Sequence, residues 1–267
     1  MNRKADEAAV LWPAPAPDVE AVARAAVALV KDGDWVGLGT GRAASAFIAA
    51  LASRIGEGLT ITAVPTSEAS ARQARALGIP LGELEEGRLL ELTVDGADEV
   101  TPDLDLLKGR GGAMVRERIV AAASKRQVIL IGGDKLVASL GTRGDVPVEV
   151  IPMARGLVLY RLKLLGMRPA VRLVSAPQQQ PHPGPHQTPG AAFVTENANM
   201  IIDCRLPVPL TSREAAREME RALLAIPGVV DTGLFLGTCE RVLVGSPDGR
   251  VDVLVPPPLT APEGRGL

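Results

Sequence analysis

Aromatic side chains are nearly absent from this sequence, since Phe, Trp and Tyr together make up 2% of its 267 residues. The hydrophobic share is still 46%, so the core must consist mainly of Ala, Val, Leu and Ile. This composition suits an α/β protein with buried parallel strands. With so few aromatics, 29 basic and 31 acidic residues, and neither half strongly basic, nucleic acid is a poor candidate partner.

Cysteine and histidine are equally scarce, and their positions argue against a metal site. Cys204 and Cys239 lie far apart without the spacing of metal ligands, which indicates inert thiols in a reducing compartment. His182 and His186 fall in the Pro- and Gln-rich stretch 176–190, where prolines prevent the helix that would align them. We therefore expect no bound metal.

Long hydrophobic runs are also missing. No apolar run is long enough to cross a bilayer, and the charged, then Pro- and Ala-rich residues 1–17 lack the apolar core of a signal peptide. We therefore expect a cytoplasmic protein. Residues 1–17 are expected to form a disordered leader and residues 256–267 a disordered tail.

The residues that are present predict alternating helices and strands. This alternation is typical of a doubly wound, mostly parallel, Rossmann-like α/β sheet. The expected strands lie at 35–39, 60–64, 92–94 and 127–131, and the expected helices at 18–31, with Asp18 as a possible cap, 43–55, 67–77 and 113–124.

The pattern changes near Asp145, where a second, smaller domain is expected. Its order of elements, β-α-β-β-α-β over about 146–236, fits an α+β, ferredoxin-like unit that contains the low-complexity loop 176–190. A helix at 212–224 with Ser212 as its cap and a strand at 228–236 belong to this unit. The larger domain then comprises residues 18–145 plus about 237–255 and would carry the active site.

The densest chemistry follows the predicted strand at 92–94. Asp95-Gly96-Ala97-Asp98-Glu99 comes first, then Lys108-Gly109-Arg110-Gly111-Gly112-Ala113, then Arg116-Glu117. Open α/β sheets bind ligands where their strands end, and a glycine loop that opens onto a helix offers unpaired N–H groups. Asp and Gly after a strand are ordinary turn formers, and each of these residues alone has a structural explanation. Their combination predicts a site for an anion or a developing oxyanion.

An earlier glycine turn, Gly37 to Arg42, favours a small phosphate. It lacks the spacing of a dinucleotide-binding loop, and no acidic residue follows the second strand. Thr40, the loop amides and Arg42 are all potential phosphate donors, although a plain strand-to-helix turn is the alternative. Thr66-Ser67 is a weaker candidate, because Ser67 could simply cap its helix. Lys135, after the fourth strand, is expected at the same edge of the sheet.

These motifs resemble the ribose-5-phosphate isomerase family of type A over about residues 19–255. Several family motifs occur in order along the whole length, which makes the resemblance specific. They are Gly39-Thr40-Gly41, Asp95 to Glu99, Lys108 to Glu117, Pro147 to Pro152, Thr195 to Asn199 and Ile226 to Val230.

The resemblance implies conversion of ribose 5-phosphate to ribulose 5-phosphate in the non-oxidative pentose phosphate pathway, through an enediolate and without cofactor or metal. It makes Glu117 the general base and places Asp95, Asp98 and Lys108 around the sugar, in a homodimer or homotetramer. The substrate-binding residues that it implies are Thr40, Gly41, Arg42, Ala43, Gly96, Ala97, Gly109, Arg110, Gly111 and Lys135. A Glu partly desolvated among small residues would have the raised pKa that such a base needs.

The sequence departs from the family pattern around the phosphate. Arg42-Ala43 stands where the family usually has Ser-Thr, and Val19 stands where a lysine is common. Further departures are Arg110 for a glycine, Gly132 for an aspartate, and Glu196-Asn197-Ala198 in the later motif. We hypothesise that Arg42 supplies the missing positive charge.

Three alternatives remain at this point. A non-catalytic sugar-phosphate sensor would keep the phosphate loop and lose the base, whereas this chain keeps Glu117 and alters the loop. An isomerase acting on a different aldose phosphate is the second. An amino-sugar-phosphate deaminase or a CoA transferase of the wider fold group is the third, and the Asp95–Asp98 and Lys108–Glu117 pairs argue against both.

Overall fold

The computed structural model describes residues 15–174 and 190–256. Three of the expected segments lie mostly outside these residues. They are the leader, the loop 176–190 with both histidines, and the tail. The first helix, α1 (Pro17–Val27), begins inside the expected leader, and its N-cap is Ala16, not Asp18. Proline suits this first helical position because its missing N–H has no partner there in any case.

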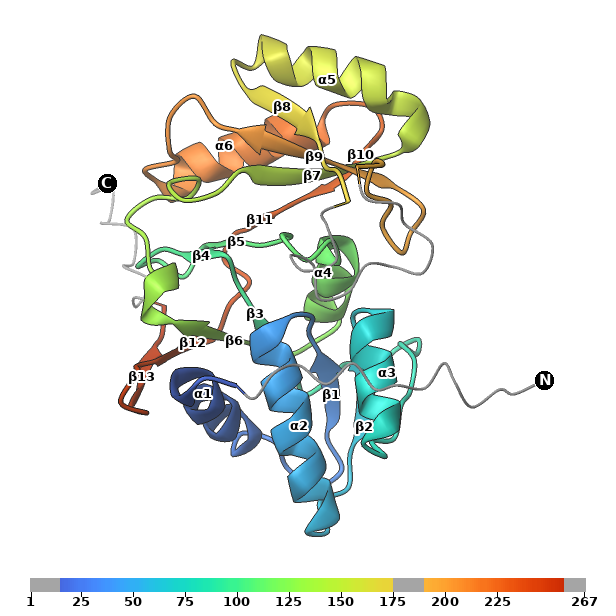
Figure 1. Ribbon diagram of the computed structural model, residues 1–267, viewed down its shortest axis with the longest axis vertical. Coiled ribbons are helices and arrows are strands. Elements are labelled where there is room, and N and C mark those ends of the chain that lie inside the picture. The colour runs from blue at the N-terminus through green and yellow to red at the C-terminus, as the bar shows by residue number, and fades with distance from the viewer. Residues whose placement is uncertain (1–14, 175–189, 257–267) are drawn as a thin grey trace, which may run out of the picture.

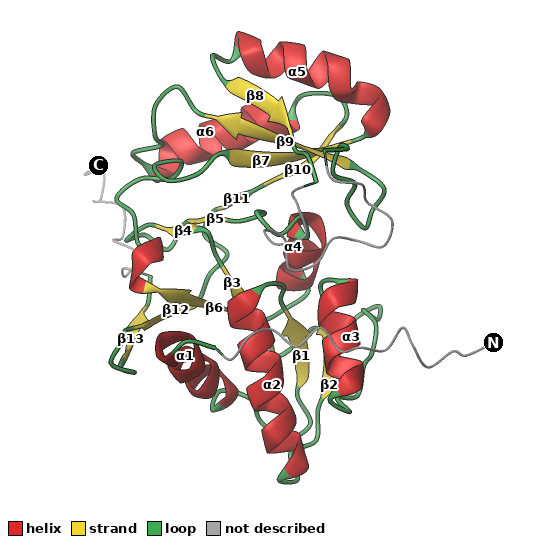
Figure 2. Ribbon diagram, viewed as in Figure 1, coloured by secondary structure: helices red, strands yellow, loops and turns green. Residues whose placement is uncertain are grey.

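A six-stranded sheet forms the larger layer of the molecule (Figures 1 and 2). All neighbours in it are parallel except the edge strand β13, which pairs antiparallel with β12. The order of its strands is β13 (Val251–Leu254), β12 (Arg241–Gly245), β6 (Gln127–Gly132), β3 (Leu92–Gly96), β1 (Trp35–Leu38) and β2 (Thr62–Pro65).

Side chains alternate between the two faces of this sheet, so each face packs against different helices. Leu92 and Val94 of β3 face the core shared with α1 and α2 (Arg42–Gly56), in which Phe47, Ile48 and Leu51 are buried. Thr93 and Asp95 therefore point to the opposite face, where α4 (Met114–Ala122) packs on β3. The doubly wound α/β fold is confirmed, and it directs Asp95 toward the helix that carries Glu117.

The second unit is a four-stranded antiparallel sheet in the order β10-β7-β9-β8. Helix α6 begins after Ser212, whose side chain accepts a hydrogen bond from the N–H of Ala215, as predicted. The ferredoxin-like order is found, whereas the exact domain boundaries stay a prediction. The elements are β7 (Val146–Val150), α5 (Arg155–Leu164), β8 (Arg168–Val171), β9 (Met200–Arg205), α6 (Arg213–Leu224) and β10 (Val229–Thr232).

A small three-stranded sheet between these two was not predicted. It consists of β4 (Glu99–Val100), β5 (Leu106–Leu107) and β11 (Leu234–Phe235), and strands of two residues show no sequence period. The single strand expected at 228–236 is wrong, because the chain leaves one sheet for the other at Gly233. A Cβ at Gly233 would lie 2.3 Å from the carbonyl oxygen of Lys108, so only glycine permits this approach.

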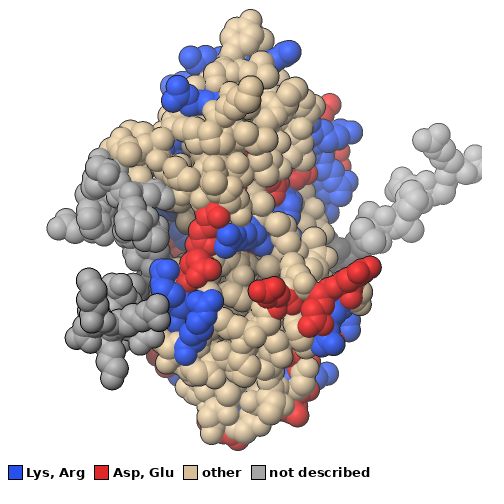
Figure 3. Space-filling model, turned by 90° about the vertical axis from the view of Figure 1, so that its right-hand side faces the viewer, with Lys and Arg blue, Asp and Glu red and all other residues tan. Residues whose placement is uncertain are grey.

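Charged side chains of both signs gather across the middle of one face of the molecule, and Lys and Arg side chains also lie at the rim of its upper part (Figure 3). Within the described ranges, no helix combines the length and the apolar character that a bilayer crossing requires.

The turn before β9 contains a residue in a strained conformation. Ala198 is exposed and has a φ of 61°, a left-handed conformation that costs an L-residue about 1–2 kcal/mol. We expect Ala198→Gly to raise the midpoint of thermal unfolding by about 1–3 °C, since the relieved strain exceeds the added entropy of the unfolded chain. The exposed Ala225, at φ −74°, is the control, and Ala225→Gly should lower the midpoint. A lower midpoint for both variants would contradict the assigned strain.

Candidate active site

Three charged side chains meet in the space between β3 and α4. The Nζ of Lys108 lies 3.0 Å from Oδ2 of Asp95 and 3.2 Å from Oε2 of Glu117. All three side chains are at most 6% exposed. Asp95 comes from β3, Lys108 follows β5, and Glu117 lies in the first turn of α4. The structure thus brings together three of the four residues to which the resemblance gave catalytic roles.

Asp95 is held by the glycine turn that follows β1. Its Oδ1 accepts hydrogen bonds from the N–H of Thr40 at 3.1 Å and the N–H of Gly96 at 2.7 Å. A Cβ at Gly39 would lie 2.3 Å from this carboxylate, so the close approach requires glycine there. The hydroxyl of Thr40 lies 2.8 Å from the hydroxyls of both Thr66 and Ser67. The two turns considered as phosphate sites therefore form one hydroxyl cluster beside Asp95.

Lys108 is anchored through its backbone and its ammonium. Its N–H donates to the carbonyl of Gly233 at 2.9 Å, and its Nζ also donates to the carbonyl of Gly96. The ammonium lies 5.6 Å from the ring centre of Phe235, within cation–π range. Burial alone would lower the pKa of Lys108, but the charges of Asp95 and Glu117 outweigh it and raise that pKa above its ordinary value.

Glu117 has a pKa well above that of an ordinary carboxyl group. Burial raises its pKa to about 8, the charge of Asp95 adds to the shift, and Lys108 opposes it. One ammonium cannot neutralise two buried carboxylates, so the cluster carries one excess negative charge until a proton binds. A carboxyl group with such a pKa can both accept and return a proton near neutral pH.

Asp98, the fourth predicted catalytic residue, lies on the other side of the lysine loop. Its Oδ2 accepts a hydrogen bond from the N–H of Arg110 at 3.0 Å, and its charge contributes to the raised pKa of Glu117. Gly109 has a φ of 107°, which favours glycine, and its carbonyl accepts a hydrogen bond of 2.7 Å from Arg172. Arg172, just after β8, was not predicted, because nothing near it in the sequence indicates this contact.

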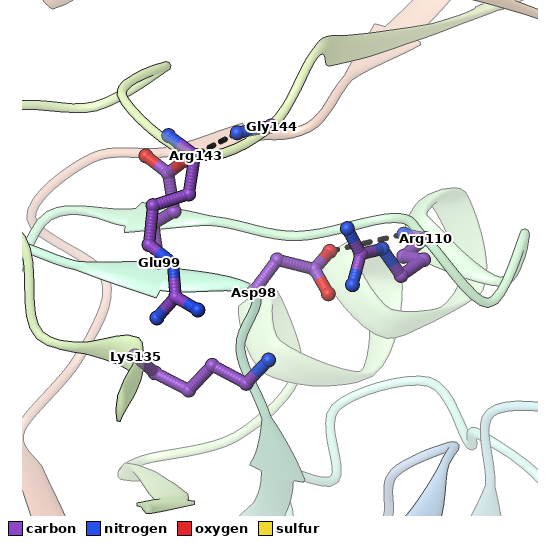
Figure 4. A pocket seen from close by; sticks show the side chains of 6 residues that line it. All are labelled: Asp98, Glu99, Arg110, Lys135, Arg143 and Gly144. Atoms are coloured by element: carbon purple, nitrogen blue, oxygen red, sulfur yellow. Dashed lines mark hydrogen bonds between the residues drawn. The ribbon is translucent and has the colours of Figure 1, made fainter. Parts of the chain in front are cut away.

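A pocket opens beside Asp98 (Figure 4). The side chains of Lys135 and Arg143 extend into it, and each lies within 4 Å of the carboxylate of Asp134, at 3.6 and 3.7 Å. Lys135 is thus at the expected edge of the sheet, while Arg143 was missed because it lies in a loop without a motif. The residues that line the pocket are Asp98, Glu99, Arg110, Lys135, Arg143 and Gly144.

Glu99 supports the wall of this pocket. Its carboxylate accepts hydrogen bonds from the N–H groups of Gly141, Arg143 and Gly144 at 2.7, 2.7 and 2.8 Å, and the residue is 1% exposed. This acid of the predicted aspartate loop therefore holds the loop that presents Arg143.

The remaining predicted substrate residues lie in three loops and are not part of the lining of this pocket. Arg42 is exposed at the start of α2, and among the described residues no side chain caps that helix. A Cβ at Gly96 would lie 3.9 Å from the Cβ of Ala43, and one at Gly111 would lie 3.9 Å from Cγ2 of Thr40. The loops 40–43, 96–97 and 109–111 therefore adjoin one another, with Gly41 as the N-cap of α2 and Ala97 packed against the core under β6.

Neither cysteine joins this site. Cys204 and Cys239 are buried free thiols, and burial raises the pKa of both. In the described part of the chain, no three His, Cys, Asp or Glu side chains are grouped as a metal ion would require.

The arrangement suits proton transfer next to a carbonyl group. Such a step needs a carboxylate that can exchange a proton and fixed donors for the oxyanion that forms. Glu117 meets the first need, and the ammonium of Lys108 with the backbone N–H groups of Gly109 and Gly111 meets the second. The N–H groups of Arg110 and Gly112 already donate to Asp98 and to the carbonyl of Gly109.

Comparison with known proteins agrees with this geometry. The family model described as ribose 5-phosphate isomerase A (phosphoriboisomerase A) matches residues 62–249. Ribose-5-phosphate isomerase A of Gloeobacter violaceus is 44% identical over 239 residues, which cover 89% of this chain and 95% of that protein. The same enzyme of Deinococcus radiodurans is 42% identical and is covered to 97%.

Solved structures give the same result. Ribose 5-phosphate isomerase A of Methanocaldococcus jannaschii matches with a TM-score of 0.77 and 38% identity, over 89% of this chain and 98% of that one. A D-ribose-5-phosphate isomerase in complex with phospho-erythronic acid matches with a TM-score of 0.78 and 31% identity, over 90% and 99%. Because relatives above 40% identity and a family model agree along most of its length, the chain belongs to the ribose 5-phosphate isomerase A family.

Proposed function

We propose that this protein interconverts D-ribose 5-phosphate and D-ribulose 5-phosphate, with Glu117 as the general base. The observation that carries this proposal is the buried cluster of Glu117, Lys108 and Asp95 in a chain of this family. The similar isomerase that binds phospho-erythronic acid supports a phosphorylated, sugar-derived ligand for the same fold.

The reaction is a proton transfer between two neighbouring carbons. Deprotonated Glu117 removes the proton from C2 of the open-chain aldose, and the electron pair of the C–H bond forms the C1–C2 double bond while the carbonyl oxygen at C1 becomes an oxyanion. Lys108 and the N–H groups after it stabilise that charge. The proton of the C2 hydroxyl passes to the oxyanion at C1, so that O1 becomes a hydroxyl and O2 carries the negative charge. The enediolate then collapses to the ketose when Glu117 returns its proton to C1 and the electron pair on O2 forms the C2 carbonyl. One carboxyl group thus serves both directions.

Asp95 and Asp98 bind and orient the sugar in this scheme. Asp95 is already bonded to Lys108 and to the N–H of Thr40, so it also fixes the ammonium that faces the oxyanion. Asp98 stands between the catalytic cluster and the pocket with Lys135, where it can accept hydrogen bonds from sugar hydroxyls.

The phosphate is bound by the start of α2 and by Lys135. The uncapped N–H groups at the start of α2 and the positive end of its dipole favour an anion. Arg42 adds a guanidinium at this point, where the family usually has hydroxyl residues. Thr40, Gly41, Ala43, Gly96, Ala97, Gly109, Arg110 and Gly111 complete the proposed substrate site.

We further propose that the protein acts in the cytoplasm as a homodimer or homotetramer. Support for self-association comes from exposed apolar side chains on and just before α5. Met153, Leu157, Tyr160 and Leu164 are 98, 44, 61 and 63% exposed, and their spacing places them on one side of the helix.

Replacement of the base tests the proposed reaction. We expect Glu117→Gln to lower kcat for ribose 5-phosphate by about a thousandfold or more, because the amide cannot accept the C2 proton. Circular dichroism should show an unchanged fold. Equal turnover by the variant and the wild-type protein would refute Glu117 as the base.

The raised pKa of Glu117 predicts opposite effects of pH on activity and stability. We expect kcat/KM to rise with pH through about 8 as Glu117 loses its proton. In the folded state the pKa lies above the ordinary 4.5, so this group's contribution to stability is complete below pH 4.5 and is lost as the pH rises through about 8.

Glu117→Gln resembles the protonated form and should escape that loss. Its advantage in free energy of unfolding over the wild-type protein should grow by at least ~1 kcal/mol between pH 5 and pH 9, measured by urea unfolding. An advantage that stays constant with pH would show that the pKa of Glu117 is not raised.

The charge of Arg42 is tested by kinetics. We expect Arg42→Ala to raise KM for ribose 5-phosphate about tenfold or more while kcat changes much less, because the lost contact is to the non-reacting phosphate. Arg250, exposed and paired with Asp248, provides the control, and Arg250→Ala should leave both constants unchanged. An unchanged KM in Arg42→Ala would exclude Arg42 from phosphate binding.

A further inference from the structure

The turn 195–199, which leads into β9, crosses from the four-stranded sheet to the helices beside the active site. The carboxylate of Glu196 accepts a hydrogen bond from the N–H of Glu68, with both oxygens at 3.0 Å. It also forms an ion pair of 2.5 Å with Arg116. Glu68 begins α3 (Glu68–Ala76), and Arg116 lies in the first turn of α4. One side chain of the second unit thus ties together two helices of the first.

Arg116 is directed entirely at this turn. Besides the ion pair, its Nη2 donates to the carbonyl of Glu196 and its Nε to the side-chain oxygen of Asn197, both at 3.0 Å. Arg116 directly precedes Glu117 in the helix. Its three bonds therefore fix the position of the turn of α4 from which the base projects.

The turn itself is held in place from inside the second unit. Oε1 of Glu149, in β7, accepts hydrogen bonds from the side chains of Thr195, Asn197 and Asn199 at 3.0, 3.1 and 2.9 Å. Glu149 is fully buried. Three side-chain bonds to one oxygen of a buried carboxyl group hold the turn in place, because each broken bond would remove part of the compensation for burying that group.

The contacts of Glu196 with Glu68 and Arg116 form a bridge between α3 and α4. The end of this bridge at Glu68 leads to the side of the catalytic cluster that holds Asp95. Glu68 follows Ser67, whose hydroxyl bonds to Thr40, and the N–H of Thr40 bonds to Asp95. Glu196 therefore connects the helix that carries Glu117 with the turn that holds Asp95. The distance between the carboxylates of Asp95 and Glu117, which lie on either side of Lys108, therefore depends on both the turn and the helix.

We propose that Glu196 is a positioning residue that keeps Glu117 in register with Lys108 and Asp95. This inference rests on the proposed isomerase function. The side chains of Arg116 and Glu196 are 35 and 38% exposed, and ion pairs of that exposure contribute only about 0–1 kcal/mol to stability. Their main effect is on geometry, since a base displaced by about 1 Å loses much of its rate.

The test is kinetic and uses a double-mutant cycle. We expect Glu196→Ala and Arg116→Ala each to lower kcat about tenfold while KM changes by roughly twofold or less. The double variant should be no slower than either single variant, because both remove the same bridge. Glu196→Gln should retain more activity than Glu196→Ala, since its amide oxygen can still accept the N–H of Glu68.

Glu91→Ala is the matched control. Glu91 is 39% exposed and pairs with Lys125 at 2.7 Å, but it lies at the opposite end of β3 from Asp95. This variant should keep wild-type kcat. The proposal would be overturned if the losses of kcat in Glu196→Ala and Arg116→Ala multiply in the double variant. It would also be overturned if either single variant has the same kcat as Glu91→Ala.

A second measurement does not depend on the substrate. Hydrogen–deuterium exchange should become faster at the amides of residues 68–70 and 114–118 in Glu196→Ala and remain unchanged in Glu91→Ala. Unchanged exchange in both variants would show that Glu196 does not hold α3 and α4 in place. If exchange becomes faster in Glu196→Ala but the wild-type protein does not isomerise ribose 5-phosphate, the structural role of Glu196 is supported and the proposed function is refuted.

Discussion

Two carboxylates and one ammonium are buried together where β3 meets α4, and this unequal count of charges governs the site. Lys108 can neutralise Asp95 or Glu117 but not both, so a proton on one carboxyl group removes the excess negative charge of the cluster. Glu117, with its pKa raised to about 8, is that group. The reversible proton transfer proposed for Glu117 would therefore depend on this shortage of positive charge.

Holding such a cluster in place requires rigid support from several directions. Asp95 is fixed by N–H groups that can approach only because Gly39 has no side chain, and Lys108 by a backbone bond to Gly233 that is possible for the same reason. The six-stranded sheet supplies the first contact, and the link between the four-stranded sheet and the small sheet supplies the second. The buried cluster of Asp95, Lys108 and Glu117 therefore receives backbone support from both units.

Local sequence patterns predicted what depends on near neighbours. The strand before Asp95, the helix that carries Glu117 and the Ser212 cap each follow from a few adjacent residues, and parallel strands bring their ends to one edge. Residues whose partners are distant in the sequence could not be found this way. The break at Gly233 has its cause at Lys108, Arg116 meets Glu196 80 residues further on, and strands of two residues carry no period.

The cations around the pocket complete the balance of charge. A sugar phosphate brings additional negative charge to a cluster that is already one positive charge short, and that charge alone would raise the pKa of Glu117 further and keep the base protonated. Lys135 and Arg143 extend into the pocket on the far side of Asp98, and Arg110 borders it. In the proposed complex they would offset the charge of the ligand without neutralising Glu117 before the ligand binds, because they lie outside the buried cluster. The proposed division of cations between the phosphate and the oxyanion would thus allow Glu117 both to gain and to lose its proton.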